Sequence, residues 1–206
     1  LISRVRLHLG GKGTAHLVNR LDRETSGIVM AAKNSEAAGE LGKIWESRAV
    51  QKIYLTIVHG EIREKAGLID ASLGKDEQSQ IAIKDCVRAD GAAAQTEFRL
   101  LKNFSRDGKD FSLVQVRPRT GRKHQIRIHL AHIGHAIVGD KLYGGDEDLY
   151  LALVQERLTE EQRRKLILTN QALHAGEISL PWRGRDLKFS VEPEGEFLEF
   201  AAVKSI

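Results

Sequence analysis

The chain contains one cysteine, Cys86, among 206 residues. A single thiol excludes an internal disulfide framework and a zinc site built from several cysteines, and it fits a reducing compartment. No apolar run approaches the roughly 20 residues that a membrane-spanning helix needs, and no segment resembles a signal peptide. These absences predict a cytoplasmic protein without a membrane anchor.

The chain also lacks the motifs of cofactor-dependent proteins. Residues 10–14 contain Gly, Lys and Thr, but not in the order of a phosphate-binding loop. Four histidines lie close together, yet residues 117–139 contain no Asp, Glu or Cys to complete a metal-ligand set. We therefore expect no cofactor and no metal, and structural roles for these histidines, which are His124, His129, His132 and His135.

Positive charge is concentrated in one stretch. The net charge is only +4, but residues 117–127 carry five basic side chains and no acidic one. Phosphate-binding surfaces concentrate basic charge in this way, whereas solvated helix faces usually mix both signs. The stretch indicates either a nucleic-acid-binding surface or a plain basic surface. Its basic residues are Arg117, Arg119, Arg122, Lys123 and Arg127.

The hydrophobic pattern predicts an α+β fold in which strands outnumber helices and no regular βαβ alternation occurs. Strands are predicted at residues 15–21, 27–32, 51–59, 96–101, 111–116, 173–180 and 187–191. Helices are predicted after a cap at Asn34, over 124–133, and over 149–168 with a break and a capping box at Thr159.

Two elements have a predicted orientation. Strand 51–59 alternates, so one side, with Ile53, Leu55 and Ile57, should face the core, while Tyr54 lies on the other side. In helix 124–133 the spacing predicts that Ile126, Leu130 and Ile133 point inward.

A carboxylate stands where the first predicted strand ends. Asp22 lies between Arg20 and Arg23 and is followed by Thr25, Ser26 and Gly27, small residues that allow a tight turn. Neighbouring cations favour an ionised carboxylate, which can act as a nucleophile or base but not as a general acid. The pattern alone also fits an ordinary surface ion pair.

Two further stretches carry possible chemistry. In Lys52-Ile53-Tyr54, the tyrosine could stack on a nucleobase and offer its hydroxyl, although strand tyrosines are often structural. In residues 119–127, Thr120 and Gly121 suit a turn that opens a helix, whose free N–H groups could bind phosphate, and Arg127 could reach a carboxylate.

Together, in this order, these stretches resemble the RluA-type pseudouridine synthase family. Its Arg-Leu-Asp-x-x-Thr-Ser-Gly is matched by residues 20–27, and its Lys-x-Tyr by residues 52–54. Its Thr-Gly-Arg-x-His-Gln-Ile-Arg-x-His and Gly-Asp-x-x-Tyr-Gly are matched by residues 120–129 and 139–144. The resemblance extends over nearly the whole chain, with further matches at residues 95–97 and 173–175.

The resemblance implies a fold, an activity and a set of site residues. The fold is a mixed, mostly antiparallel sheet flanked by helices with a cleft across the sheet. The activity is isomerisation of specific uridines in structured rRNA or tRNA, by base flipping and without a cofactor. The catalytic residues implied are Asp22, Tyr54 and Arg127. Tyr54 stacks on the uracil and is the candidate, itself or through a neighbouring water, to remove the C5 proton in the last step, and Arg127 pairs with Asp22. The RNA-binding residues expected are Arg20, Lys52, Arg119, Arg122, Lys123 and His124.

The chain departs from the family pattern in two places. Asn19 stands where the family usually has His, so chemistry at this position should not depend on a titrating group. The Asn-Lys-Pro-x-Gly segment that usually precedes the aspartate motif is absent, and the chain begins at Leu1. We expect residues 1–206 to form one catalytic domain that lacks its N-terminal part, with an upstream RNA-binding domain as an open possibility. The stretch between Gly145 and Leu173 is longer than is usual in the family, which predicts an added helical pair.

Other functions were weighed on the same residues. A non-catalytic RNA-binding module of the same fold is the alternative, but a binder has no use for a carboxylate that faces a polyanion. A hydrolytic glycosidase fits less well, because one carboxylate stands out where a pair is needed. The sequence does not choose between rRNA and tRNA, and a monomer is the default expectation.

Overall fold

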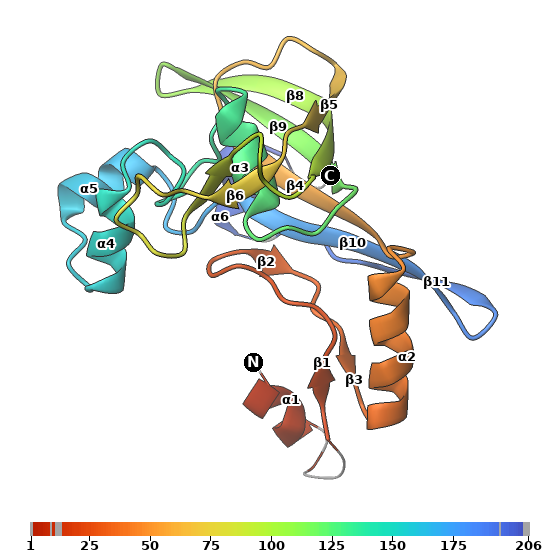
Figure 1. Ribbon diagram of the computed structural model, residues 1–206. Coiled ribbons are helices and arrows are strands. Elements are labelled where there is room, and N and C mark those ends of the chain that lie inside the picture. Colours follow the sequence, from red (N-terminus) through yellow and green to blue (C-terminus); the bar gives the residue numbers. More distant parts are fainter. Residues whose placement is uncertain (1, 9, 11–13, 194, 204–206) are drawn as a thin grey trace.

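The computed structural model describes residues 2–8, 10, 14–193 and 195–203. Its centre is a curved seven-stranded sheet in the order β11-β10-β4-β9-β8-β5, with β2 added beside β10 (Figure 1). Neighbouring strands are antiparallel, except for the parallel pair β2 and β10. The strands are β2 (Ser26–Gly27), β4 (Gln51–His59), β5 (Ala66–Asp70), β8 (Gln95–Arg106), β9 (Lys109–Pro118), β10 (Leu173–Trp182) and β11 (Arg185–Ser190).

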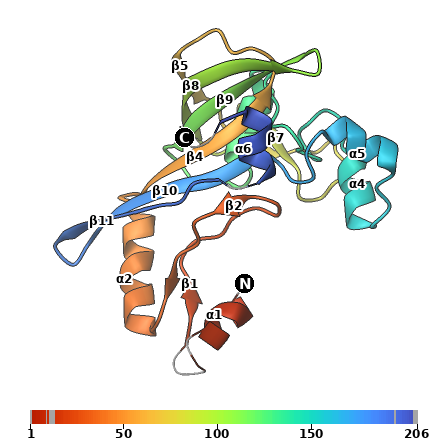
Figure 2. The same ribbon diagram turned by 180° about the vertical axis from the view of Figure 1, so that it is seen from behind.

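The β4 strand is more central than its sequence pattern predicted. It pairs with β10 on one edge and β9 on the other, and helices α3 (Gln125–His132) and α6 (Glu196–Ala201) lie on opposite faces of the sheet (Figures 1 and 2). All four residues 55–58 are therefore buried. The prediction that only one side of this strand faces the core was wrong, because the helices cover both faces.

The α3 helix carries Ile126 and Leu130 into the main core, as predicted. Ile133, by contrast, is 37% exposed, so its predicted inward position was wrong. The helix ends at His132, and Ile133 has already left helical geometry at φ −86°, ψ 11°. The helical period no longer determines the direction of its side chain.

An arm of short elements extends below β10 in Figure 1. It contains α1 (Ile2–His8), which the sequence pattern did not predict, the paired strands β1 (His16–Leu17) and β3 (Ala31–Ala32), and α2 (Ser35–Glu46).

The predicted cap of α2 is confirmed, since the Asn34 side chain accepts a hydrogen bond from the Ala37 N–H at 2.8 Å. Leu41 of α2 packs on Ile178 and Leu180 of β10 in a second small core. The glycine-rich stretch 10–14 falls mostly on residues 11–13, outside the described residues.

At the other end of the sheet lie a small ladder and a helical pair. The ladder strands β6 (Leu73–Lys75) and β7 (Asp85–Val87) were not predicted. The added pair consists of α4 (Asp148–Val154) and α5 (Glu160–Leu166), and the predicted capping box between Thr159 and Gln162 is present. Among the described helices, none is long and apolar enough to cross a membrane.

Gly27 lets the strand that follows Asp22 lie directly against the main sheet. Its φ is +110°, and a Cβ placed on it would lie 2.3 Å from the carbonyl oxygen of Ala175. The Ile28 N–H donates to the same oxygen at 3.0 Å, which fixes the pairing. Only glycine combines this conformation with so close an approach.

Gly27→Ala should lower the free energy of unfolding by roughly 2–4 kcal/mol, because the added methyl group meets the Ala175 backbone and the φ is unfavourable. Urea denaturation measures this loss. Gly39→Ala is the matched control, because that glycine is exposed in α2 with no atom within 4 Å of an added Cβ. The control should be stabilised by up to about 1 kcal/mol, and equal stability of the two variants would contradict the interpretation.

Candidate active site

Asp22 lies in the irregular link between β1 and β2, as predicted. The Thr25 N–H donates to the Asp22 carbonyl at 3.1 Å, which closes a tight turn over residues 22–25. The Asp22 side chain is 29% exposed, and its Oδ2 lies 3.5 Å from Nη1 of Arg127. The two residues are 105 positions apart in the chain, and the fold brings them together as the resemblance implied.

The Arg127 guanidinium is held by a second carboxylate. Its Nε and Nη2 donate to the two oxygens of Asp140 at 2.7 and 2.9 Å, a bidentate pair. The guanidinium also lies over the Tyr143 ring, 4.9 Å from its centroid. Burial alone would lower the pKa of Arg127, but the hydrogen bonds and charge of Asp140, with the charge of Asp22, raise it. Arg127 is therefore a fixed cation.

The Asp140 side chain is fully buried, and both of its carboxylate oxygens accept hydrogen bonds. Its Oδ1 accepts hydrogen bonds from the N–H groups of Leu142 and Tyr143 at 2.8 and 3.0 Å. Burial acts to raise the pKa of this carboxyl, but Arg127 and these two amides outweigh burial and hold the pKa below its usual value. Each buried charge of the Arg127–Asp140 pair is thus compensated by its partner, and Asp140 also by two backbone N–H groups.

The end of the Asp22 loop is anchored by the C-terminal part of the chain. Gln171 donates through Nε2 to Thr25 Oγ1 at 2.6 Å and to the Arg23 carbonyl at 3.3 Å. Ser26 Oγ lies 2.8 Å from Nδ1 of His174. Each small residue after the aspartate therefore has a defined contact, which explains their order in the sequence.

Tyr54 lies two strands away from this loop, in the same cross-strand row. Gly27 pairs with Ala175, and Ala175 pairs with Tyr54. Burial and the negative charge of Asp22 raise the pKa of Tyr54 to about 12. Its phenol is therefore protonated at neutral pH. The Asp22 carboxylate lies close enough for its negative charge to disfavour the phenolate.

Comparison with known proteins shows the family of this chain. A family profile described as RNA pseudouridylate synthase matches residues 4–132, more than half of the chain. The chain belongs to this family. The RluA-type family assignment and the predicted α+β fold of mixed, mostly antiparallel sheet and flanking helices are thereby confirmed.

Individual relatives support the assignment. An uncharacterized RNA pseudouridine synthase of Chloroflexus aurantiacus is 37% identical over 89% of this chain and 52% of its own length. A ribosomal large subunit pseudouridine synthase D of Borreliella burgdorferi is 36% identical over 62% of this chain and 38% of its own length. The structure of human RNA pseudouridylate synthase domain containing 1 superposes with a TM-score of 0.77 at 25% identity, covering 97% of this chain and 76% of that one. The chain spans about half the length of the first two curated relatives.

In this synthase-family chain, Gln125 shapes the loop that precedes α3. Its Oε1 accepts hydrogen bonds from the Thr120 hydroxyl at 2.7 Å and the Arg122 N–H at 3.0 Å. Gly121 in this loop approaches Lys52, whose Nζ would lie 3.7 Å from an added Cβ. Burial lowers the pKa of Lys52. The helix predicted over 124–133 begins at Gln125, so residues 120–124 form the loop that leads into it.

The predicted RNA-binding side chains are not all free cations. Arg119 pairs with Glu97, and Lys123 Nζ lies 3.0 Å from Asp85 Oδ2. The stretch that is free of acids in the sequence thus meets acids from β8 and β7 in space. Of the others, Arg20 is exposed, and Arg122 Nε donates to the Ala93 carbonyl at 3.2 Å.

His124 and His129 both contact other side chains of the fold through their ring nitrogens. His124 Nδ1 lies 2.9 Å from the Tyr143 hydroxyl, and burial, with the charge of Arg127, lowers its pKa. His124 is therefore a neutral group at the site. His129 is buried, and its two ring nitrogens contact Thr96 Oγ1 at 2.8 Å and the Ala71 carbonyl at 2.9 Å. That engagement supports a structural role for His129.

A cavity of about 50 Å³ lies beside Arg127. Its wall includes Arg23 and Glu24 of the Asp22 loop, His124, and Tyr150 of α4. The added helical pair therefore forms part of the surroundings of the site. This contribution could not be deduced from the sequence, because no motif connects α4 to Asp22.

Several residues of the site were given no role from the sequence. Asp140 and Tyr143 belong to the Gly-Asp-x-x-Tyr-Gly motif, and His174 to the match at residues 173–175. Those motifs were the available signal, but the sequence did not show that they contact Arg127 and Ser26.

Asn19 joins the two sides of the loop that contains Asp22. Its Oδ1 accepts a hydrogen bond from the Met30 N–H at 2.7 Å, and its Nδ2 donates to the Ile28 carbonyl at 3.2 Å. These bonds need no proton transfer, as expected for this position.

Asp140→Asn should lower the free energy of unfolding by about 3 kcal/mol at neutral pH, because Arg127 then keeps a buried charge without its main counter-ion. Folding lowers the pKa of Asp140, so its contribution is present above the ordinary carboxyl pKa and is lost as the pH falls through the folded value. The difference between the two proteins in urea denaturation should therefore shrink in acid.

The control for this experiment is Asp90→Asn. Asp90 also pairs with an arginine, Arg88, at 2.7 Å, but its side chain is 70% exposed. Exposed pairs of this kind contribute little, so this variant should unfold at the wild-type urea concentration. Equal destabilisation by both substitutions would show that burial of the Asp140 pair is not the decisive factor.

Proposed function

We propose that this chain converts uridine to pseudouridine in structured RNA, with Asp22 as the catalytic carboxylate. The observation that carries the proposal is the Asp22 carboxylate, partly exposed and 3.5 Å from a buried arginine that Asp140 fixes in place. Such an arrangement orients the carboxylate and leaves part of it open to a ligand. Residues 1–206 would act as one catalytic domain built on the continuous sheet.

The reaction breaks the bond between N1 of uracil and the ribose, rotates the base and joins C5 to the same ribose carbon. Asp22 would act at the sugar by attack on the anomeric carbon or by removal of the neighbouring ribose proton, or it would attack the base. All three routes need an oriented carboxylate. Arg127 provides the orientation, and its own fixed charge requires no rearrangement during the reaction.

Tyr54 would stack on the uracil that has entered the site. Because burial and the Asp22 charge raise its pKa to about 12, Tyr54 is not a ready base at neutral pH. The last step, removal of the proton from C5, would therefore use a water or the Asp22 carboxylate as acceptor, with the Tyr54 hydroxyl as a hydrogen-bonding neighbour. The hydroxyl is then helpful but not indispensable.

The RNA would be held by the basic side chains around the site. A base inside folded RNA is not accessible and must be flipped out, which costs a few kcal/mol. Arg20 is exposed and lies two residues before Asp22, so it would fill the gap that the flipped nucleotide leaves. The loop with Arg119, Arg122 and Lys123, and Lys52 beneath it, would contact the phosphates. The pairing of Arg119 and Lys123 with acids implies that Arg122 and Lys52 contribute more to phosphate binding.

Asp22→Asn should leave RNA binding intact and reduce pseudouridine formation to background, because the amide cannot act as nucleophile or base. Tyr54→Phe, which retains the ring, should slow the reaction by roughly 100-fold, the lower end of the range for losing one catalytic hydrogen-bond donor. Product is measured by tritium release from 5-tritiated uridine in RNA. A purified Asp22→Asn protein with wild-type turnover would refute the mechanism.

We further propose that the substrate is rRNA or tRNA, and that a cytoplasmic monomer acts on it. One relative is named for the ribosomal large subunit, so large-subunit rRNA is the first RNA to examine. Pseudouridines mapped in cells with and without the gene should differ at one or a few uridines. An unchanged map, with RNA binding retained, would support the alternative of a non-catalytic binding module.

A further inference from the structure

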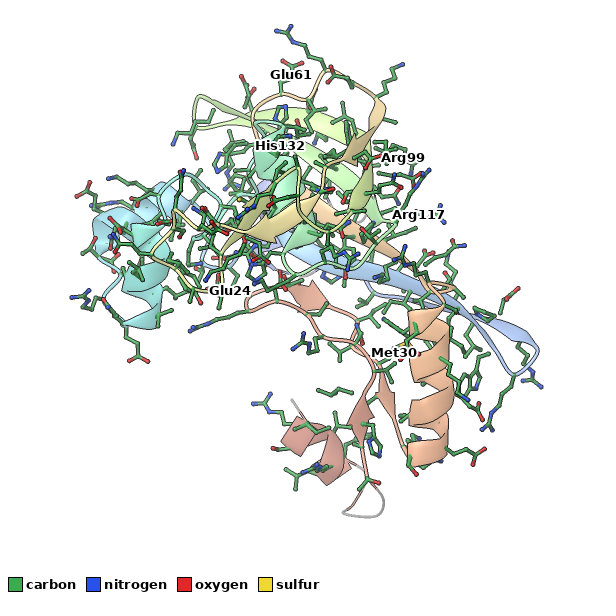
Figure 3. The ribbon with its side chains drawn as sticks, in the orientation of Figure 1. Glu24, Met30, Glu61, Arg99, Arg117 and His132 are labelled. Carbon is green, nitrogen blue, oxygen red and sulfur yellow. The ribbon has the colours of Figure 1, made fainter. Side chains whose placement is uncertain are left out.

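An ion pair beside Asp22 is not used by the proposed mechanism. Lys141 Nζ lies 2.7 Å from Oε2 of Glu24, and the two side chains are only 3% and 16% exposed. Glu24 lies within the Asp22 turn, and Lys141 directly follows Asp140 in the chain. Figure 3 places Glu24 where the loop before β2 meets the part of the molecule that carries α4 and α5. The pair therefore joins the Asp22 loop to the segment that orients Arg127.

Lys141 is a rigid anchor for this contact. Its ammonium group donates to Glu24 Oε2, to the Thr169 carbonyl at 2.8 Å and to the Gly139 carbonyl at 3.3 Å. An ammonium group has three N–H donors, so all of them are engaged. The position of Lys141 is thus fixed by the interior of the protein before Glu24 reaches it.

Glu24, in contrast, lies in a turn that would not keep its shape unaided. Its φ is +69°, a conformation that residues with side chains seldom adopt. The backbone hydrogen bond from Thr25 to the Asp22 carbonyl closes the turn around it. A turn with this unfavourable residue needs an external contact to remain in one conformation, and the Lys141 ammonium supplies one.

We propose that Glu24 and Lys141 are positioning residues that hold the Asp22 backbone, and with it the carboxylate, at reacting distance from the ribose. Asp140 and Lys141 are adjacent, so one short segment controls Asp22 in two ways. Asp140 orients Arg127 against the Asp22 side chain, and Lys141 fixes the turn that carries it. This inference rests on the proposed function.

The test compares Glu24→Ala, Lys141→Met and the double variant on a transcript that carries a uridine identified by the mapping experiment. Single-turnover rates at saturating RNA report the chemical step, and RNA Kd and Tm are measured in parallel. Each single substitution should slow the reaction about 10- to 100-fold, because a displacement of about 1 Å is enough for such a loss. RNA Kd should change less than about threefold, since neither side chain is assigned to RNA binding.

The double variant distinguishes action through the pair from two separate effects. Residues that act through one contact are not additive, so the double variant should be no slower than the slower single variant. If Lys141→Met does not fold, Glu24→Ala, on the turn, still provides the measurement. The control is Arg183→Met/Glu40→Ala, which removes an Arg–Glu pair of 2.9 Å that joins the turn between β10 and β11 to α2, apart from the residues that line the cavity beside Arg127. It should keep the wild-type rate.

Three results would overturn the positioning role: a wild-type rate for Glu24→Ala, losses that multiply in the double variant, or a loss that lies entirely in RNA Kd. An equal loss in the control pair would do the same. Failure of the proposed function is distinguishable, because the wild-type protein itself would then form no pseudouridine.

Discussion

The guanidinium of Arg127 lies between two carboxylates of different kinds, and the site depends on this arrangement. Asp140 is buried, accepts hydrogen bonds from Nε and Nη2 of the guanidinium and accepts two more from backbone N–H groups. Asp22 is partly exposed and contacts only one nitrogen, at 3.5 Å. Asp140 accepts hydrogen bonds from two guanidinium nitrogens. Asp22 is therefore oriented by the third nitrogen without forming a short bidentate salt bridge. A carboxylate in this condition remains available to a ligand.

The position of Asp22 is a property of the whole sheet rather than of its own loop. The loop has little regular structure, and it is held by contacts to β10 and to residues just before that strand. Gly27 approaches the Ala175 backbone, and Gln171 binds Thr25. The row that includes Gly27 and Ala175 continues to Tyr54. Asp22 and Tyr54, the proposed catalytic carboxylate and stacking ring, are thus related through three neighbouring strands.

Burial shifts the pKa values of several groups around Asp22. It raises the pKa of Tyr54 and lowers the pKa values of Lys52 and His124. In each case burial makes the charged form of the side chain less favourable than it is in water. Arg127 and Asp140, by contrast, compensate one another and form a charged pair that the fold holds in place.

The sequence by itself determined the family, the α+β class and most of the strands, and it singled out Asp22, Tyr54 and Arg127 as candidate site residues, because these depend on local order and short motifs. It also predicted the Asn34 cap and the Thr159 capping box, which are local interactions. It did not show that both faces of β4 are covered, that Glu97 and Asp85 neutralise part of the basic stretch, or that Lys141 reaches Glu24. Those contacts join residues up to 117 positions apart. Only the tertiary structure decided them, because burial and pairing depend on which distant segments the sheet brings together.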